Sequence, residues 1–431
     1  MVNTKVTTTQ QFNNLIEFRQ RVYEEGLVKE RDAQFELVET LLTGCKIQSF
    51  AELSLSPLHR RAYSSAYAAM KRGRQDESTL RQVFAEQVPG DEELVMSLDA
   101  SKWPHRQADT LSGRVLEPYH GQVMPVHVYS MLAWIPEAHT SWSLPLNTVR
   151  LNPEQTEVEV GAAQVDEVCR RIQDRRLKVI TADGRYGTHH FMRAMQDVPA
   201  AWVVRLAKNR VFWQKPGPYV FGRPAKHGPA FRFKDPATWT MPGEDIQFEH
   251  PFYGRVRLRR WHGLHDKLAP DLPITLLRAE VHLEWANPPD PLWLGYNGPA
   301  DVSVSTIWEW YMKRWPIEPA FRFRKHRLFW TTPCLRLPER CDRWTMLVDI
   351  AYWQIWLARH LVTDCPLPWQ RLQPRRLTPE RILQGFPALL ATLPALSKPV
   401  QGRGKSPGWP RGQPRVPRQR FPAVKRAHVA S

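Results

Sequence analysis

The chain has 431 residues and a formal net charge of +17, and 42% of its residues are hydrophobic. This length is enough for about two to four domains with sizeable cores. The five cysteines are scattered and form no C-x-x-C pair, which argues against a disulfide framework or a zinc site and indicates a reducing compartment. Because no apolar run reaches the roughly 18 residues of a membrane span and no signal core opens the chain, we expect a cytoplasmic protein without a membrane partner.

Positive charge is spread over the whole chain. Nine Lys and Arg residues and no acidic residue lie from Lys398 onward, which leaves a net charge of +8 for the rest. A basic body with a basic tail indicates a polyanion as partner, most simply nucleic acid, although a basic proteome or a solubility tail would give the same totals. Residues 396–431 are rich in Pro, Gly, Arg and Gln, so we expect a disordered tail.

Residues 1–90 show helical periodicity and predict an N-terminal helical domain. The segment 12–27 has apolar side chains at helical spacing, and a second helix with a basic end stops at Gly73. Such a domain either binds DNA or serves as a plain structural bundle, and the sequence favours neither alternative.

Residues 91–330 predict an α/β sheet with an antiparallel start, because three apolar strands come first and strands then alternate with helices. A segment at about 209–300 is rich in Pro, Gly and short strand-like pieces and predicts a β-rich insertion, which ends in a returning strand, "PLWLGYNG". The expected strands are 93–99, 122–136, 141–151, 177–183 and 200–208, and the expected helices are 158–175 and 187–196. Residues 331–395 predict a C-terminal helical region, in which Thr378 is the N-cap of one helix and Pro379 its first residue.

Two apolar strands of this sheet end in an acid, Asp99 in "ELVMSLD" and Asp183 in "LKVITAD". Side chains at the ends of adjacent strands meet at one edge of an open sheet. Two carboxylates there repel each other unless they share a proton or bind a cation, and Mg²⁺ prefers such oxygen ligands. Either Asp could instead cap its strand or turn, as Asp often does.

The stretch "YMKRWPIEPAFRFRK" places one acid among many cations. At about 100° per residue, Tyr311, Arg314, Glu318 and Lys325 fall within an arc of about 60° if the helix is continuous. We therefore expect Glu318 to be a third metal-binding carboxylate, with the cations beside it holding phosphate oxygens. Pro316 predicts a restarted helix, which would tilt the residues before it. An exposed charged helix would give the same spacing.

This spacing resembles the Y-R-E-K signature of bacterial DDE transposases of the insertion-sequence-four type. Tyr311, Arg314, Glu318 and Lys325 match the signature without a gap. The segments "SLDAS" and "TADGRYG" look like those that hold the family's first two catalytic acids. A β-rich insertion before the last acid is also typical of that family. The resemblance covers residues 90–330 and implies an RNase H-like catalytic core.

The resemblance also implies a function, a transposase that cuts and joins DNA at the ends of an insertion sequence. Asp99, Asp183 and Glu318 would hold two Mg²⁺ ions, which Mn²⁺ can replace, for phosphoryl transfer. The implied partners are double-stranded DNA, as transposon ends and as target, and a second copy of the chain in the DNA complex. The implied location is the bacterial cytoplasm, in association with the nucleoid.

Five further contacts with DNA are implied. Tyr311, Arg314 and Lys325 would hold phosphates, and Trp293 in the returning strand would stack on a flipped base, unless it is an ordinary packed tryptophan. Arg185 would touch DNA or only shape the turn in which it lies.

Two alternative functions stay open. One is an RNase H-like nuclease or resolvase without strand transfer, which would have no need of the cationic face and Trp293. The other is a non-catalytic DNA-binding protein from a decayed element, against which the intact acids argue.

Overall fold

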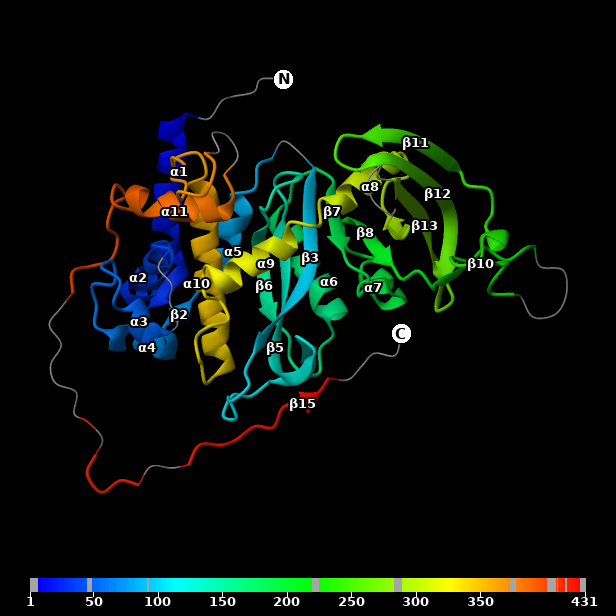
Figure 1. Ribbon diagram of the computed structural model, residues 1–431. Coiled ribbons are helices and arrows are strands. Elements are labelled where there is room, and N and C mark those ends of the chain that lie inside the picture. Colours follow the sequence, from blue (N-terminus) through cyan, green and yellow to red (C-terminus); the bar gives the residue numbers. More distant parts are fainter. Residues whose placement is uncertain are drawn as a thin grey trace.

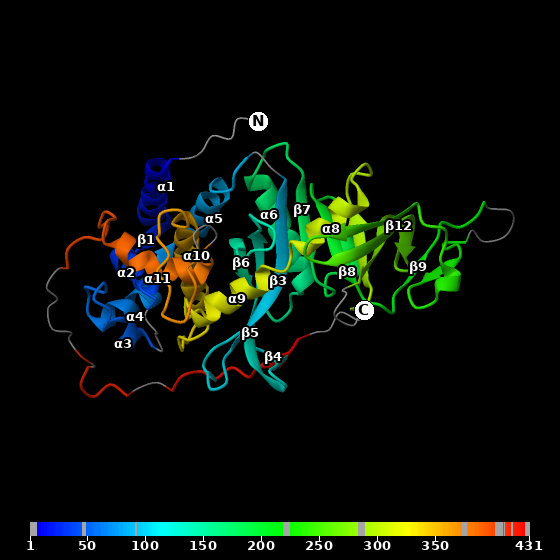
Figure 2. The ribbon, with the colours of Figure 1, turned by 45° about the horizontal axis from the view of Figure 1, so that its top comes forward.

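The computed structural model describes residues 7–44, 49–90, 93–218, 225–282, 289–372, 377–400, 408, 410–414 and 417–426. Its architecture is mixed α/β, with one large mixed sheet and a helical layer beside it (Figures 1 and 2). None of the described helices is both long and apolar enough to cross a membrane.

The centre of the sheet consists of five strands in the order β6-β5-β3-β7-β8. Strands β3, β5 and β6 are antiparallel neighbours, whereas β7 and β8 run parallel to β3. The antiparallel start is therefore as predicted, and the arrangement is consistent with an RNase H-like core. The bounds are β3 Leu94–Pro104, β4 Val115–Tyr119, β5 Gln122–Trp134, β6 Leu144–Arg150, β7 Lys178–Ala182 and β8 Ala201–Leu206.

Helices cover both faces of these strands. On one face α6 packs closely on β3. A side chain at Gly161 of α6 would not fit there, because its Cβ would lie 2.6 Å from the side chain of Leu98. On the other face Arg324 in α9 donates to the sulfur of Met131, which is the residue opposite Asp99 in the β3–β5 pair, at 2.9 Å. The helices are α6 Glu157–Arg171, α7 His189–Ala194, α8 Val304–Met312 and α9 Ile317–His326.

The β-rich insertion extends the same sheet. Its returning strand, β14, pairs antiparallel with β8, and β13, β12, β9 and β10 continue outward from it, with β11 on β12. The predicted strand "PLWLGYNG" is confirmed, since β14 spans Leu292–Asn297. The other elements are β9 Val211–Trp213, β10 Ala230–Arg232, the 3₁₀ turn Pro236–Thr238, β11 Glu244–His250, β12 Gly254–Asp266 and β13 Ala269–His282.

The N-terminal and C-terminal helices form one layer with a shared core (Figure 1). Phe84 stacks on Trp353 with ring centroids 5.8 Å apart, and Phe50 meets the edge of Trp344 at 5.2 Å. The elements are α1 Thr8–Arg21, a π-helix at Val22–Gly26, β1 Leu27–Lys29, α2 Arg31–Leu41, α3 Phe50–Leu53, α4 Tyr63–Arg72, β2 Arg74–Gln75, α5 Glu77–Glu86, α10 Pro338–Leu357 and α11 Pro379–Leu390. Thr378 occupies the N-cap position of α11 as predicted, although its side chain makes no capping hydrogen bond.

Two predictions need correction. The strand predicted to end at Asp99 continues to Pro104, because β5 keeps pairing with it as far as Val126. The tail predicted to be disordered contains a short strand, β15 Val424–Lys425, parallel to β4. It is held there because Arg114 bonds to the carbonyl of Phe421 and Arg426 lies 3.8 Å from Glu117. Tail residues 401–407, 409, 415–416 and 427–431 lie outside the described part of the chain.

Candidate active site

Asp99 in β3 and Asp183, directly after β7, lie at neighbouring positions where these two parallel strands end their pairing. The register between β3 and β7 pairs Leu98 with Ala182, and each acid is the next residue in the chain. Main-chain groups orient both carboxylates: the N–H of Ala100 donates to Asp99 at 2.7 Å, and the N–H of Arg185 donates to Asp183 at 2.9 Å. The fold therefore brings the two predicted acids together.

The carboxyl group of Asp99 is electrostatically unusual. Burial and the neighbouring charge of Asp183 raise the pKa of Asp99 to about 7, against the smaller opposing effects of Arg314 and Arg185. Two carboxylates held this close resist ionising together, and a divalent cation between them would relieve that repulsion. A pair of acids of this kind can accept a cation.

The Y-R-E-K segment is divided between α8 and α9. Both helices stop short of residues 313–316, which form turns, and Pro316 is the N-cap of α9, as the predicted restart required. Arg314 lies in this turn, where its Nη2 is 2.8 Å from Oε1 of Glu318 and its guanidinium is 5.9 Å from the ring centroid of Tyr311. Arg314 also interacts electrostatically with Asp99, so it is within reach of this acid while it is bonded to Glu318.

Tyr311 belongs to the same group of side chains. Its pKa is raised by burial and by Asp183, while Arg314 and Arg205 act in the opposite direction. Arg205 is an exposed residue of β8 that was not predicted from the sequence, because a single arginine in an apolar strand carries no motif.

Glu318 is the most exposed of the three acids, with 51% of its side chain accessible, and it is paired with Arg314. In the described part of the chain, the three carboxylates do not come within 4.8 Å of one another as a set. The arrangement is therefore two neighbouring acids, Asp99 and Asp183, and a third acid, Glu318, that is paired with Arg314.

Lys325 and Arg324 point to different surroundings although they are neighbours in α9. The Nζ of Lys325 is 5.7 Å from the ring centroid of Tyr119, and burial together with Arg324 and Lys102 lowers its pKa to about 8. Arg324 is fully buried and forms an ion pair with Asp349 in α10. One cation of the stretch thus anchors the helix in the interior, which the linear pattern of charges did not reveal.

Arg185 lies at the edge of the acid pair. Its guanidinium is 3.1 Å from the carboxylate of Glu157, the first residue of α6, and half of its side chain is exposed. It also lowers the pKa of Asp99, so it is within electrostatic reach of the site.

Trp293 lies in the insertion, among other aromatic rings. It is 3% exposed, stacks on Phe233 with centroids 4.0 Å apart, and packs against Trp239 and Trp261. Its role in DNA binding stays a prediction, and stacking on a base requires the ring to separate from Phe233.

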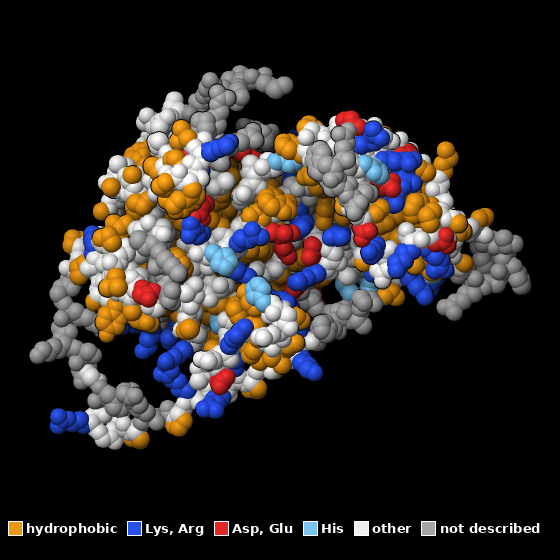
Figure 3. All heavy atoms as spheres, viewed as in Figure 1, with side chains coloured by type: hydrophobic (Ala, Val, Ile, Leu, Met, Phe, Trp, Pro, Cys, Tyr) orange, Lys and Arg blue, Asp and Glu red, His pale blue; other side chains and the backbone are white. Residues whose placement is uncertain are grey.

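The donor set fits a hard divalent cation. Asp99, Asp183 and Glu318 offer carboxylate oxygens, which Mg²⁺ prefers, and the raised pKa of Asp99 reflects a repulsion that a cation would remove. On the face where α9 crosses β3, acidic side chains are grouped and surrounded by Lys and Arg side chains (Figure 3). A surface of this kind can hold a metal ion and a phosphodiester together.

A family model described as DDE superfamily endonuclease matches residues 23–267. The match begins within the N-terminal helical layer, includes Asp99 and Asp183, and ends directly after β12 of the insertion, before Glu318. A search of curated proteins found no match.

Proposed function

The chain belongs to the DDE superfamily endonucleases, and we propose that it is a transposase that cuts and joins double-stranded DNA at the ends of an insertion sequence. Nucleases of this superfamily act on DNA and use divalent metal ions, generally Mg²⁺. The observation that supports the proposal most strongly is that Asp99 and Asp183 each follow the last residue pair, Leu98 and Ala182, of two parallel strands. Arg314 lies within electrostatic reach of Asp99 and is bonded to Glu318.

Asp99, Asp183 and Glu318 are the residues proposed to hold Mg²⁺. When bound, Mg²⁺ polarises phosphoryl oxygens and lowers the pKa of a bound water or hydroxyl group. The main-chain N–H groups that bond to Asp99 and Asp183 keep these carboxylates in place before the ion arrives. Glu318 becomes available when Arg314 exchanges this acid for a phosphate of the DNA.

The proposed chemistry is phosphoryl transfer without a covalent bond to the protein. In the first step a water oxygen bonds to phosphorus, the P–O3′ bond breaks, and the leaving 3′-oxygen takes up a proton. In the second step that 3′-oxygen attacks a phosphorus of the opposite strand or of the target, and its proton passes to the new leaving 3′-oxygen. Arg314 and Lys325 hold the phosphates, with Tyr311 and Arg185 beside them.

We propose that two copies of the chain act on two DNA ends in one complex. Joining two ends to one target requires both to be held at once, which a pair of identical sites achieves by symmetry.

The test uses the full chain, Mg²⁺ and labelled DNA taken from either side of the coding sequence. A transposase produces breaks at defined positions and joined products with a second DNA. Breaks without joined products would indicate a nuclease or resolvase, and binding without breaks would contradict catalysis altogether. Asp183→Asn is the negative control.

A further inference from the structure

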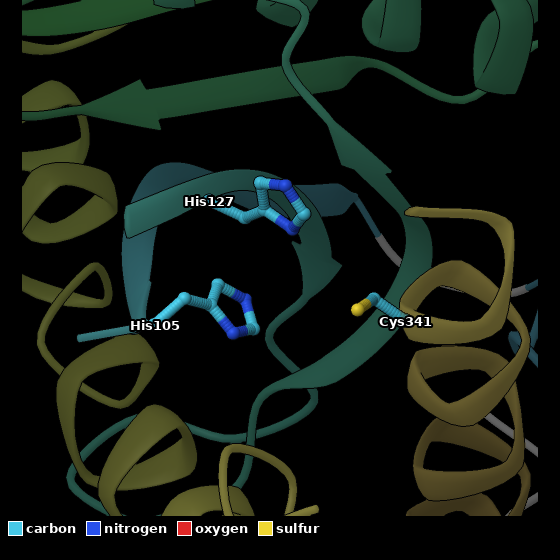
Figure 4. A group of neighbouring side chains, drawn as sticks. All are labelled: His105, His127 and Cys341. Carbon is cyan, nitrogen blue, oxygen red and sulfur yellow. The ribbon is translucent and has the colours of Figure 1, made fainter. Parts of the chain in front are cut away.

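A second group of chemically active side chains lies away from the acids (Figure 4). His105 directly follows β3, His127 is in β5, and Cys341 is in the first turn of α10. The three side chains point toward one another, and one ligand atom of each lies within 4.8 Å of the other two. All three are buried, with exposed fractions of 6%, 0% and 0%.

The fold brings these residues together in a rigid setting. Trp103 pairs with His127, which puts His127 beside the end of β3. Side chains two apart in a strand share a face, so the side chain of His105 lies on the same face as those of Trp103 and His127. Helix α10 is fixed against this face by Asp342, which accepts hydrogen bonds from Tyr129 at 2.8 Å and from Arg150 at 3.0 Å. The residue before Asp342 is Cys341, so its position is fixed as well.

Both imidazoles have a buried nitrogen without a hydrogen-bond partner. The Nε2 of His127 is 2.9 Å from the carbonyl of Ser112, to which it donates, and this leaves Nδ1 with a free lone pair. In His105 the unpartnered atom is Nε2. Buried polar atoms in native proteins are rarely left without a partner, so these two nitrogens require an explanation.

We propose that His105, His127 and Cys341 bind a Zn²⁺ ion. One thiolate and two neutral imidazoles form a borderline-soft donor set that suits Zn²⁺ and not Mg²⁺. The bond from His127 to Ser112 is the outer contact that fixes the orientation of a metal-binding histidine. Zn²⁺ bonds of about 2.0–2.3 Å place ligand atoms roughly 3.3–3.8 Å apart, so the side chains need to close by at most about 1.5 Å.

A fourth ligand reaches the ion from solvent. A cavity of about 580 Å³ is lined by Trp103, His105, Cys334 and Arg336, and it gives access to the cluster from the His105 side. A water molecule completes the tetrahedron. On binding, the Cys341 thiol loses its proton to solvent and the sulfur forms the bond to Zn²⁺. The ion joins β3, β5 and α10, and so pins the strand that carries Asp99 to the helical layer.

The test is metal analysis of the full-length protein and of two cysteine variants. The matched control is Cys169→Ser, because Cys169 is also buried but belongs to no such group in the described part of the chain. We expect about one Zn²⁺ per chain in the wild type and in Cys169→Ser. In Cys341→Ser we expect affinity to fall by more than ~100-fold, since loss of an outer-shell partner alone costs ~10–100-fold. Titration of the zinc-free wild type with Co²⁺ should give a thiolate charge-transfer band.

Two results would overturn the proposal. One is a folded wild type with neither zinc nor a Co²⁺–thiolate band, and the other is equal zinc in Cys341→Ser and Cys169→Ser. If Cys341→Ser does not fold, His127→Gln and the Co²⁺ spectrum of the wild type decide the question. The result is independent of DNA cleavage, because Asp183→Asn should keep its full zinc content.

Discussion

The two halves of strand β3 differ in what they offer a metal ion. The first half carries Asp99, which is partly buried beside Asp183 and lies within electrostatic reach of Arg314 and Arg185. The second half ends at His105, which lies with His127 and Cys341 in the interior. Oxygen donors near solvent suit a labile Mg²⁺ and a charged substrate, whereas buried nitrogen and sulfur donors suit a permanent Zn²⁺.

In this comparison, the Asp99 part of β3 serves the proposed chemistry, and the end of β3 at His105 serves stability. A change of the Asp99 carboxyl group should abolish the proposed reaction and leave folding intact, whereas a change at His105 should mainly lower stability. Helix α9 shows the same division, with the Arg314–Glu318 pair at its accessible start and Arg324 buried against α10.

The largest expected effect is on the acid pair. Asp183→Asn should lower the rate of DNA cleavage by about 10³-fold or more, because metal-based charge stabilisation is worth several kcal/mol. DNA binding, measured by fluorescence anisotropy, should change little. The control is Asp197→Asn, at an exposed position after α7. Cleavage by Asp183→Asn at the wild-type rate would remove the contrast between the two halves.

The next effect concerns the buried side of α9. Arg324→Ala leaves the buried carboxylate of Asp349 without its partner and should lower the free energy of unfolding by about 3–5 kcal/mol. Arg322→Ala, two residues earlier and exposed, should change it by less than about 0.5 kcal/mol. Urea denaturation of both variants measures the difference. Equal stability of the two would show that α9 does not depend on its buried cation.

A tenfold effect is expected from pH. The pKa of Asp99 is raised to about 7, so the protonated form is favoured in the folded protein and the metal competes with that proton. Between about pH 8 and about pH 6 the ionised fraction falls from about nine-tenths to about one-tenth, and Mn²⁺ affinity should fall about tenfold.

The raised pKa of Asp99 makes the stability of the metal-free protein fall as pH rises, whereas metal affinity increases with pH. The folded protein binds this proton more tightly than the unfolded chain, so Asp99 favours folding at low pH, and that contribution is lost as pH rises from about 4 through about 7. Calorimetric titration with Mn²⁺ at several pH values measures the affinity. In the metal-free protein, Asp99→Asn should remove this pH dependence of the free energy of unfolding, and an unchanged profile would assign it to other groups.

The smallest effect is expected from the tail. A chain that ends at Ser397 lacks nine cations, and its DNA affinity should fall several-fold at moderate salt. The slope of log K against log salt should fall by roughly one for each DNA phosphate that the tail neutralises in the full chain. A chain that ends at Arg426 keeps all nine cations and is the control. Equal salt slopes for the two chains would show that the tail does not contact DNA phosphates, and would leave it only the structural role of pairing with β4.

The sequence predicted the features that depend on the pattern of residues within one short segment. Apolar periodicity predicted the central strands, and the spacing from Tyr311 to Lys325 drew attention to the segment in which Arg314 is bonded to Glu318. Distant pairing was not predictable: the continuation of β3 past Asp99 depends on β5, and β15 depends on contacts with Arg114 and Glu117.

The histidine–cysteine cluster shows the same limit. No zinc site was predicted from the sequence, because known ligand spacings are short and His105, His127 and Cys341 are far apart along the chain. Only the β3–β5 register and the docking of α10 bring them together. Burial of Arg324 was hidden in the same way, since a charge pattern does not show which cation faces a buried acid such as Asp349.

The most direct test of the acid site is the position of Mn²⁺ in a crystal of the protein with DNA, found from its anomalous scattering. We predict Mn²⁺ between the carboxylates of Asp99 and Asp183, with Glu318 bound to metal and Arg314 moved to a phosphate. Mn²⁺ bound elsewhere, with the Arg314–Glu318 pair intact beside the DNA, would contradict the assignment of these three acids.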